Sequence, residues 1–227
     1  MGDVLSYDVG EPRSGRRRLF VFDMDGTLLP DATGMVALAT ALGTADAVDE
    51  LERRFADGTL DTVGFTTEIH RLWGVIAPEV ARAAFDGCAK LADIHRVTAD
   101  IARNGDVSCL ITMSQNVFAD HFLDFGFDHV HASAYPAEAG AVVRAEDVLT
   151  PESKPVIVRE LCERHGLDYG DTVAFGDSGS DLPLFRSLKY TVSVNGTPSI
   201  ADVSAAEYRG GSLLDAYRIA LDLIGAQ

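Results

Sequence analysis

A short apolar run that ends in two aspartates constrains this chain more than any other stretch. Residues 19–22 are apolar, and Asp23, Asp25, Gly26 and Thr27 follow at once. A short apolar run bounded by a turn signal is typical of a buried strand in a parallel sheet. In open α/β sheets, functional groups gather just past the carboxyl ends of such strands. Two carboxylates there are costly unless a cation pairs with them, so the stretch predicts a functional site, with a plain acidic turn as the alternative.

Three further signals follow in chain order: a hydroxyl after an apolar run, a lysine that opens a helical segment, and two aspartates after another apolar run. Strands that alternate with helices predict an α/β protein with a Rossmann-like parallel sheet. Such a sheet would bring these groups to one edge. The residues are Ser114, Gln115 and Asn116 after 107–113, Lys154 before 155–165, and Gly176, Asp177 and Asp181 after 172–175.

These motifs, in this order, resemble those of the haloacid dehalogenase (HAD) superfamily of phosphotransferases. The resemblance covers about residues 18 to 200 and implies the HAD fold with a small inserted helical cap. The matching stretches are Asp23-x-Asp25-Gly26-Thr27 for the first motif, Ser114 for the second, Lys154 for the third and Gly176-Asp177-x-x-x-Asp181 for the fourth.

The resemblance implies a role for each aspartate of the first motif. Asp23 would be the nucleophile that forms an aspartyl-phosphate, which splits one difficult step into two. Asp25 would protonate the leaving alkoxide and then deprotonate the water that hydrolyses the intermediate. Phosphatases of the family keep this second aspartate, so its presence favours phosphatase chemistry.

The resemblance also implies how phosphate and metal are bound. Lys154 would neutralise the phosphate and the nucleophile. Mg²⁺ is the expected cofactor, because it is a hard cation that takes oxygen ligands. The expected phosphate-binding set is Ser114, the backbone N–H groups of Gln115 and Asn116, Thr27 (which would also orient Asp25) and Lys154. The expected metal ligands are Asp23, the backbone carbonyl of Asp25, and Asp177.

Asp181 has two interpretations at this stage. It could act one layer behind the metal, holding either a metal-bound water or Lys154. It could instead cap the helix expected at 182–188, a position that suits aspartate. Both roles can coexist.

Strand-like runs vanish between residues 31 and 91, where helical periodicity replaces them. We therefore expect a core domain of 16–30 plus 92–227 and a helical cap domain of 31–91, which would exclude water from the site. Expected cap helices are 35–42, 45–55, 63–73 and 78–90. Expected core strands are 19–22, 107–113, 127–133, 172–175 and 191–194, with helices at 93–103, 117–125, 154–165, 182–188 and 213–224 and a hairpin arm near 142–143.

Composition narrows the partners. A net charge of −16 argues against nucleic acid, and no apolar stretch reaches the ~18 residues that span a bilayer. We expect a loose arm at 1–15 and, without a signal-peptide core, a cytoplasmic protein.

The basic run Arg16–Arg18 is interpreted as a solvated flank. Cys88, Cys109 and Cys162 form no CxxC pair, which disfavours a disulfide framework or zinc site. A monomer and a homodimer both remain open.

The substrate is the least constrained feature. Cap position and the segment 57–61 resemble the phosphoserine phosphatase branch, which has a glutamate after the first motif and an arginine in a cap helix. Here Asp31 stands near the glutamate position, while Ile69, flanked by His70 and Arg71, stands at the arginine position. Phe65 and Trp73 are either substrate-facing or cap core.

We expect a Mg²⁺-dependent hydrolase of a small phosphomonoester other than phosphoserine, such as a sugar phosphate or a biosynthetic intermediate. A phosphoserine phosphatase is one alternative. A phosphotransferase that passes the phosphoryl group to an acceptor alcohol is another. A non-catalytic binding protein is disfavoured, because Asp23, Asp25, Lys154 and Asp177 are all present.

Overall fold

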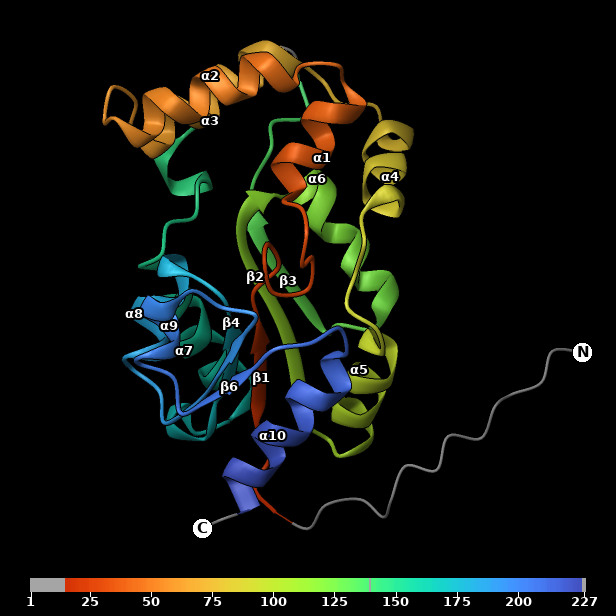
Figure 1. Ribbon diagram of the computed structural model, residues 1–227, viewed down its shortest axis with the longest axis vertical. Coiled ribbons are helices and arrows are strands. Elements are labelled where there is room, and N and C mark those ends of the chain that lie inside the picture. Colours follow the sequence, from red (N-terminus) through yellow and green to blue (C-terminus); the bar gives the residue numbers. More distant parts are fainter. Residues whose placement is uncertain (1–14, 139, 226–227) are drawn as a thin grey trace, which may run out of the picture.

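A single parallel sheet forms the centre of the computed structural model, which describes residues 15–138 and 140–225 (Figure 1). The arm expected at 1–15 lies outside these residues, apart from Gly15. The sheet order is β3-β2-β1-β4-β5-β6, which confirms the predicted α/β class. The strands are β1 Leu19–Phe22, β2 Val107–Gln115, β3 His129–Ser133, β4 Val173–Gly176, β5 Tyr190–Val194 and β6 Ala206–Tyr208.

Helices cover both faces of the sheet (Figure 1). One face carries α5 Ile94–Arg103, α6 Asn116–Ala119 and α10 Leu213–Gly225. The other carries α7 Ser153–His165, α8 Leu182–Phe185 and α9 Pro198–Ala201. Short 3₁₀ turns lie at Asp120–Phe125, Ala145–Asp147, Tyr169–Asp171 and Gly179–Asp181. None of the helices within 15–138 and 140–225 combines the length and apolar character needed to cross a membrane.

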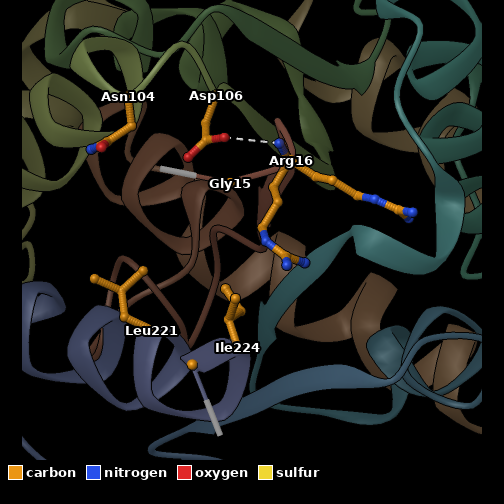
Figure 2. Close-up of a pocket in the computed structure, with 8 residues that line it drawn as sticks. Gly15, Arg16, Asn104, Asp106, Leu221 and Ile224 are labelled. Carbon is orange, nitrogen blue, oxygen red and sulfur yellow. Dashed lines mark hydrogen bonds between the residues drawn. The ribbon is translucent and has the colours of Figure 1, made fainter. Parts of the chain in front are cut away.

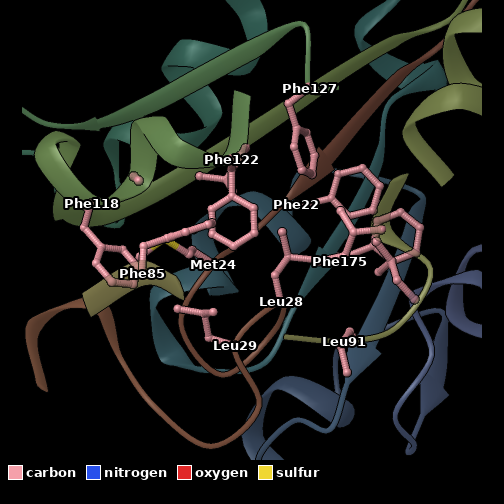
Figure 3. Packing of buried hydrophobic residues seen from close by; sticks show 14 of the residues in the cluster. Phe22, Met24, Leu28, Leu29, Phe85, Leu91, Phe118, Phe122, Phe127 and Phe175 are labelled. Atoms are coloured by element: carbon pink, nitrogen blue, oxygen red, sulfur yellow. The ribbon is translucent and has the colours of Figure 1, made fainter. Parts of the chain in front are cut away.

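The apolar run of β1 is continuous because both faces of the sheet are buried. Phe20 and Phe22 point into the cluster under α5 and α10, whereas Leu19 and Val21 point into the cluster under α7. The ring of Phe22 stacks on that of Phe175 from β4 with centroids 4.6 Å apart. Figure 3 shows this aromatic core beside the loop that follows β1. The end of β1 is therefore held rigidly from both sides.

Four helices are inserted between β1 and α5 and lie beyond the carboxyl ends of the strands (Figure 1). Local signals start three of them: Thr33 and Asp61 accept backbone N–H bonds as N-caps, and Pro78 opens the last one. The hydrophobic cluster of the core continues into this insertion without a break. The helices are α1 Gly34–Ala41, α2 Ala45–Ala56, α3 Thr62–Trp73 and α4 Pro78–Gly87. The division into a core and a cap domain stays a prediction.

Several expectations about the core need correction. Strand β2 runs on through Ser114 and Gln115, because pairing with β3 resumes at Gln115–Ser133 after an irregularity. The hairpin arm near 142–143 is wrong, since these residues are in neither helix nor strand. Strand β6 and helix α9 were not expected. Both are very short, and β6 is stabilised by pairing with β5 rather than by its own pattern.

The interpretation of Arg16–Arg18 as a solvated flank is wrong for Arg18. Its side chain is only 15% exposed, its guanidinium forms an ion pair with Asp171 at 3.0 Å, and it lies over the Tyr190 ring. Arg18 therefore fastens the residues before β1 to the segment before β4 and to the first residue of β5. The three cysteines are free, and Cys109 is buried in β2 as expected.

A cavity of about 470 Å³ lies at the amino-terminal ends of β1 and β2, away from the motif residues. Figure 2 shows Asp106 in its wall, where the carboxylate accepts a hydrogen bond of 2.8 Å from the backbone N–H of Arg18. Leu221 and Ile224 of α10 line another side. None of the motif residues lines this cavity.

Candidate active site

The loop after β1 fixes the first two aspartates. The backbone N–H of Asp23 donates to the carbonyl of Phe175 at 2.9 Å, which extends the β1–β4 pairing by one residue. Beyond it, Met24, Leu28 and Leu29 are fully buried and anchor the loop, as Figure 3 shows. The apolar side chains thus turn inward, and the carboxylates between them emerge at the carboxyl edge of the sheet.

Lys154 lies at the centre of the site. It is the second residue of α7, only 2% exposed, and its Nζ lies 2.6 Å from Asp23 Oδ1 and 2.6 Å from Asp181 Oδ1. A buried ammonium is stable only with such partners. The sequence expectation that Lys154 meets the first-motif aspartate therefore agrees with this geometry.

Asp25 is held by groups from two other elements. Its Oδ2 accepts from Ser114 Oγ at 2.6 Å and from Thr112 Oγ1 at 3.3 Å, and its Oδ1 accepts from the backbone N–H of Gly34 at 2.7 Å. Thr112 and Gly34 were missed. Thr112 and Ser114 stand two apart on β2, and this spacing, which puts side chains on one face, could have indicated Thr112.

The fourth-motif aspartates complete the cluster from the end of β4. Asp181 Oδ2 accepts from the backbone N–H groups of Asp177 and Ser178 at 3.0 and 3.3 Å, while its other oxygen holds Lys154. Asp181 stands at the N-cap position of α8, but its side chain makes no capping hydrogen bond to that helix and instead closes the capping box of the 3₁₀ turn Gly179–Asp181 with Ser178. Thr27 Oγ1 contacts Asp23 and Asp177 at 3.4 and 3.3 Å rather than Asp25.

Acidic side chains are concentrated in this site. Burial raises the pKa of Asp23 well above its ordinary value although Lys154 opposes the rise, and burial also raises the pKa of Asp25. Burial and the neighbouring Asp181 raise the pKa of Asp177 to about 6. Burial disfavours charge on Lys154, but Asp23 and Asp181 more than offset this, so its pKa is raised and it stays protonated. One lysine thus faces four aspartates.

The donor set fits a hard divalent cation. Carboxylate oxygens of Asp23, Asp177 and Asp181 lie within 4.8 Å of one another. All are oxygen donors, which Mg²⁺ prefers, and a second positive charge would offset the surplus of carboxylates. Asp181 is the most heavily engaged of the three, because its oxygens accept from Lys154 and from two backbone N–H groups.

The Asp177 carboxylate occupies the space that a side chain at Gly26 would fill. Replacing Gly26 with alanine is expected to lower both the free energy of unfolding and the Mg²⁺-induced rise in Tm, because the new Cβ would overlap the Asp177 carboxylate. Gly58→Ala is the matched control: both glycines have φ of +79°, but nothing lies within 4 Å of a Cβ at Gly58. Backbone strain costs each variant about 1 kcal/mol. Equal losses, and an unchanged Mg²⁺ response in both variants, would contradict this packing.

The remaining residues predicted for the site do not all lie together. Gln115 and Ser114 line a pocket of about 360 Å³ beside Asp25, whereas the Asn116 side chain accepts from the backbone N–H of Tyr135. Asp31 is exposed, His70 is buried against Tyr135, and Arg71 is exposed and pairs with Glu68. The structure does not bring Asp31, His70 or Arg71 to this pocket. Trp73 is cap core, with its Nε1 bonded to Thr44 Oγ1.

The chain is similar to known phosphatases in sequence and structure. The phosphoserine phosphatase of Methanocaldococcus jannaschii is 18% identical over 190 residues, or 82% of this chain and 90% of that protein. A solved phosphoserine phosphatase with a phospho-aspartyl intermediate analogue is 17% identical, with a TM-score of 0.73, covering 90% of this chain and 99% of the other. A substrate-bound phosphoserine phosphatase is 16% identical, with a TM-score of 0.74, covering 91% and 99%.

At these identities the structural likenesses show the fold alone. The family model of haloacid dehalogenase-like hydrolases matches residues 20–186, which include the aspartates, the serine and the lysine described above. This match covers most of the chain and agrees with the order of the four motifs. The protein belongs to the haloacid dehalogenase-like hydrolase family, in the structural branch that resembles phosphoserine phosphatase.

Proposed function

We propose that this protein is a Mg²⁺-dependent phosphatase that hydrolyses a small phosphomonoester other than phosphoserine through an aspartyl-phosphate. The observation that carries the proposal is the convergence of Asp23, Asp25 and Asp177, which follow two adjacent strands, with Lys154 at the start of α7. Membership of the hydrolase family supports the same chemistry.

Two half-reactions use the first two aspartates. A carboxylate oxygen of Asp23 attacks phosphorus as the bond to the leaving alkoxide breaks, and Asp25 gives that alkoxide a proton. Asp25 then takes a proton from water as the water oxygen bonds to phosphorus, which releases phosphate and regenerates Asp23. Burial raises the pKa of Asp25, which supports its role as an acid.

Other residues of the site offset negative charge or position the reacting groups. Lys154 offsets the negative charge that Asp23 and the phosphoryl group share. Ser114, together with the backbone N–H groups of Gln115 and Asn116, is proposed to bind phosphoryl oxygens. Thr27 would keep Asp23 and Asp177 together.

Mg²⁺ would be held by Asp23, Asp177 and the backbone carbonyl of Asp25, with Asp181 behind them. When bound, it would supply positive charge that offsets the negative charge of the phosphoryl group.

Metal removal tests this proposal. Treatment with a chelator is expected to lower phosphate release from phenyl phosphate by roughly a hundredfold or more, because one electrostatic contribution of this kind is worth about that much. Added Mg²⁺ should restore the rate and raise Tm, and Asp177→Asn should need more Mg²⁺ for both effects. Full activity in the chelator, with no shift of Tm on adding Mg²⁺, would overturn the metal assignment.

Phosphoserine phosphatase is the second candidate, because the similar proteins above carry that name. The carboxylate of phosphoserine needs a cationic partner, and Arg71 is exposed and paired with Glu68. Comparing the kcat/KM for phosphoserine with that for other phosphomonoesters separates the two. A clear preference for phosphoserine would favour this second candidate.

A further inference from the structure

The pocket beside Asp25 is lined by residues from both the core and the inserted helices. Its volume is about 360 Å³, within the roughly 300–1,000 Å³ range of small-molecule sites. Asp25 and Ser114 line it from the core, and Glu52, Phe55 and Phe65 line it from α2 and α3. Under the proposed mechanism Asp25 protonates the leaving group, so the pocket lies where the departing alcohol would be.

Much of the pocket wall is apolar and open. Met35, Phe55, Phe65, Met113 and Val148 contribute apolar surface. The rings of Phe55 and Phe65 lie 5.4 Å apart, yet Phe55 is 45% exposed and Met113 is 38% exposed. Large apolar side chains left open around a pocket are suited to cover an apolar ligand body.

The charged side chains that line the pocket are all acidic. Its lining includes the carboxylates of Asp25 and Glu52 and no lysine, arginine or histidine among the described residues. The Glu52 carboxylate has no ion-pair or hydrogen-bond partner within the described chain. A ligand carboxylate would therefore meet repulsion without a cation to pair with. An ammonium group would be attracted to Glu52, and aromatic rings such as those that line this pocket also attract cations.

We propose that this pocket selects phosphomonoesters whose alcohol combines an aromatic or other apolar body with an amine, and that it rejects those bearing a carboxylate. This inference rests on the phosphatase function proposed above. It assigns Glu52 as the group that recognises the amine and Phe55 and Phe65 as the surface that receives the body.

Matched substrates test the selection. O-phosphotyramine and O-phosphotyrosine differ only in a carboxylate, and phenyl phosphate lacks both the amine and the carboxylate. The expected order of kcat/KM is O-phosphotyramine, phenyl phosphate, O-phosphotyrosine. The first should exceed the last by about tenfold or more, because like-charge contacts at a binding surface are costly. Equal rates for the two matched esters, or faster hydrolysis of O-phosphotyrosine, would overturn the inference and leave the phosphatase function standing.

Matched variants assign the effect to the pocket. Glu52→Gln should reduce the preference for O-phosphotyramine over phenyl phosphate by roughly three- to fivefold, the size of an exposed ion pair. Glu50→Gln is the control, since it removes a charge from the same helix but Glu50 pairs with Arg53 and does not line the pocket. Phe55→Ala should slow hydrolysis of O-phosphotyramine and phenyl phosphate more than that of phosphoethanolamine, which has no aromatic body. An identical change in Glu52→Gln and Glu50→Gln would contradict the assignment of Glu52.

Binding without turnover separates the two proposals. Calorimetry on Asp23→Asn should give a lower Kd for O-phosphotyramine than for O-phosphotyrosine, and Glu52→Gln in that background should narrow the difference. If this pattern appears but the wild-type protein hydrolyses none of the esters, the pocket inference stands and the phosphatase function fails. If the wild-type protein hydrolyses them and this binding difference is absent, the pocket inference fails alone.

Discussion

Replacing Asp23 with asparagine is expected to lower kcat by roughly a thousandfold or more, because the amide cannot act as the nucleophile. The fold should survive. The side chain keeps its shape, and Asp181 still pairs with Lys154 at 2.6 Å. Phosphate release from phenyl phosphate measures the loss, and circular dichroism with thermal unfolding measures the fold.

A neighbouring variant is the control for Asp23→Asn. Asp31→Asn removes a carboxylate that follows the same loop but is exposed and lies away from the pocket lining. We expect it to keep catalytic activity within about twofold, as surface substitutions away from a site generally do. Residual turnover in Asp23→Asn close to that of Asp31→Asn would show that another group attacks phosphorus.

Replacing Lys154 with methionine is expected to have the largest effect on stability. The change leaves Asp23 and Asp181 buried without their cation, and removing one partner of a buried pair costs about 3–5 kcal/mol of the free energy of unfolding. Activity should also fall by roughly a hundredfold or more, because charge on the phosphoryl group is no longer offset. Urea unfolding with and without Mg²⁺ measures the first effect, and bound Mg²⁺ should recover part of the loss.

Lys189→Met is the control for Lys154→Met. Lys189 is exposed, so the same chemical change there should alter the free energy of unfolding by less than about 1 kcal/mol. A similar small loss in both variants would mean that the ion pairs of Lys154 do not stabilise the folded protein.

The sheet core and the cluster of aspartates around Lys154 could be predicted because their sequence signals are local. The run at β1 and the aspartates after it lie within a few residues, and the topology of a parallel sheet then brings Lys154 and Asp177 to the same edge. The end of α7 could also be predicted, because Gly166 adopts the left-handed conformation that ends this helix.

The partners of each polar group could not be predicted in the same way. Thr27 was expected to orient Asp25, but the tight loop turns its hydroxyl toward Asp23 and Asp177. The N–H of Gly34 reaches Asp25 only because α1 begins beside the loop, a placement set by packing against Phe118 and Met24. Such contacts depend on tertiary packing rather than on motif spacing.

The substrate pocket was the part least accessible from sequence. Amphipathic periodicity indicates that one face of α2 and α3 is buried, but it does not say which side chains the other elements leave open. Phe65 was recognised as a candidate, whereas Glu52 and Phe55 were not, because their approach to Asp25 depends on how the insertion packs on β2.

Trapping the phosphoryl group on the protein identifies the nucleophile directly. The wild-type protein, with Mg²⁺ and phenyl phosphate, is quenched in acid during turnover, reduced with borohydride and digested for mass spectrometry. Borohydride converts an aspartyl-phosphate to homoserine, so we predict homoserine at position 23 and unmodified Asp25 and Asp177. Homoserine at another position, or an unmodified Asp23 in protein that is turning over under conditions that trap a reference aspartyl-phosphate, would contradict it.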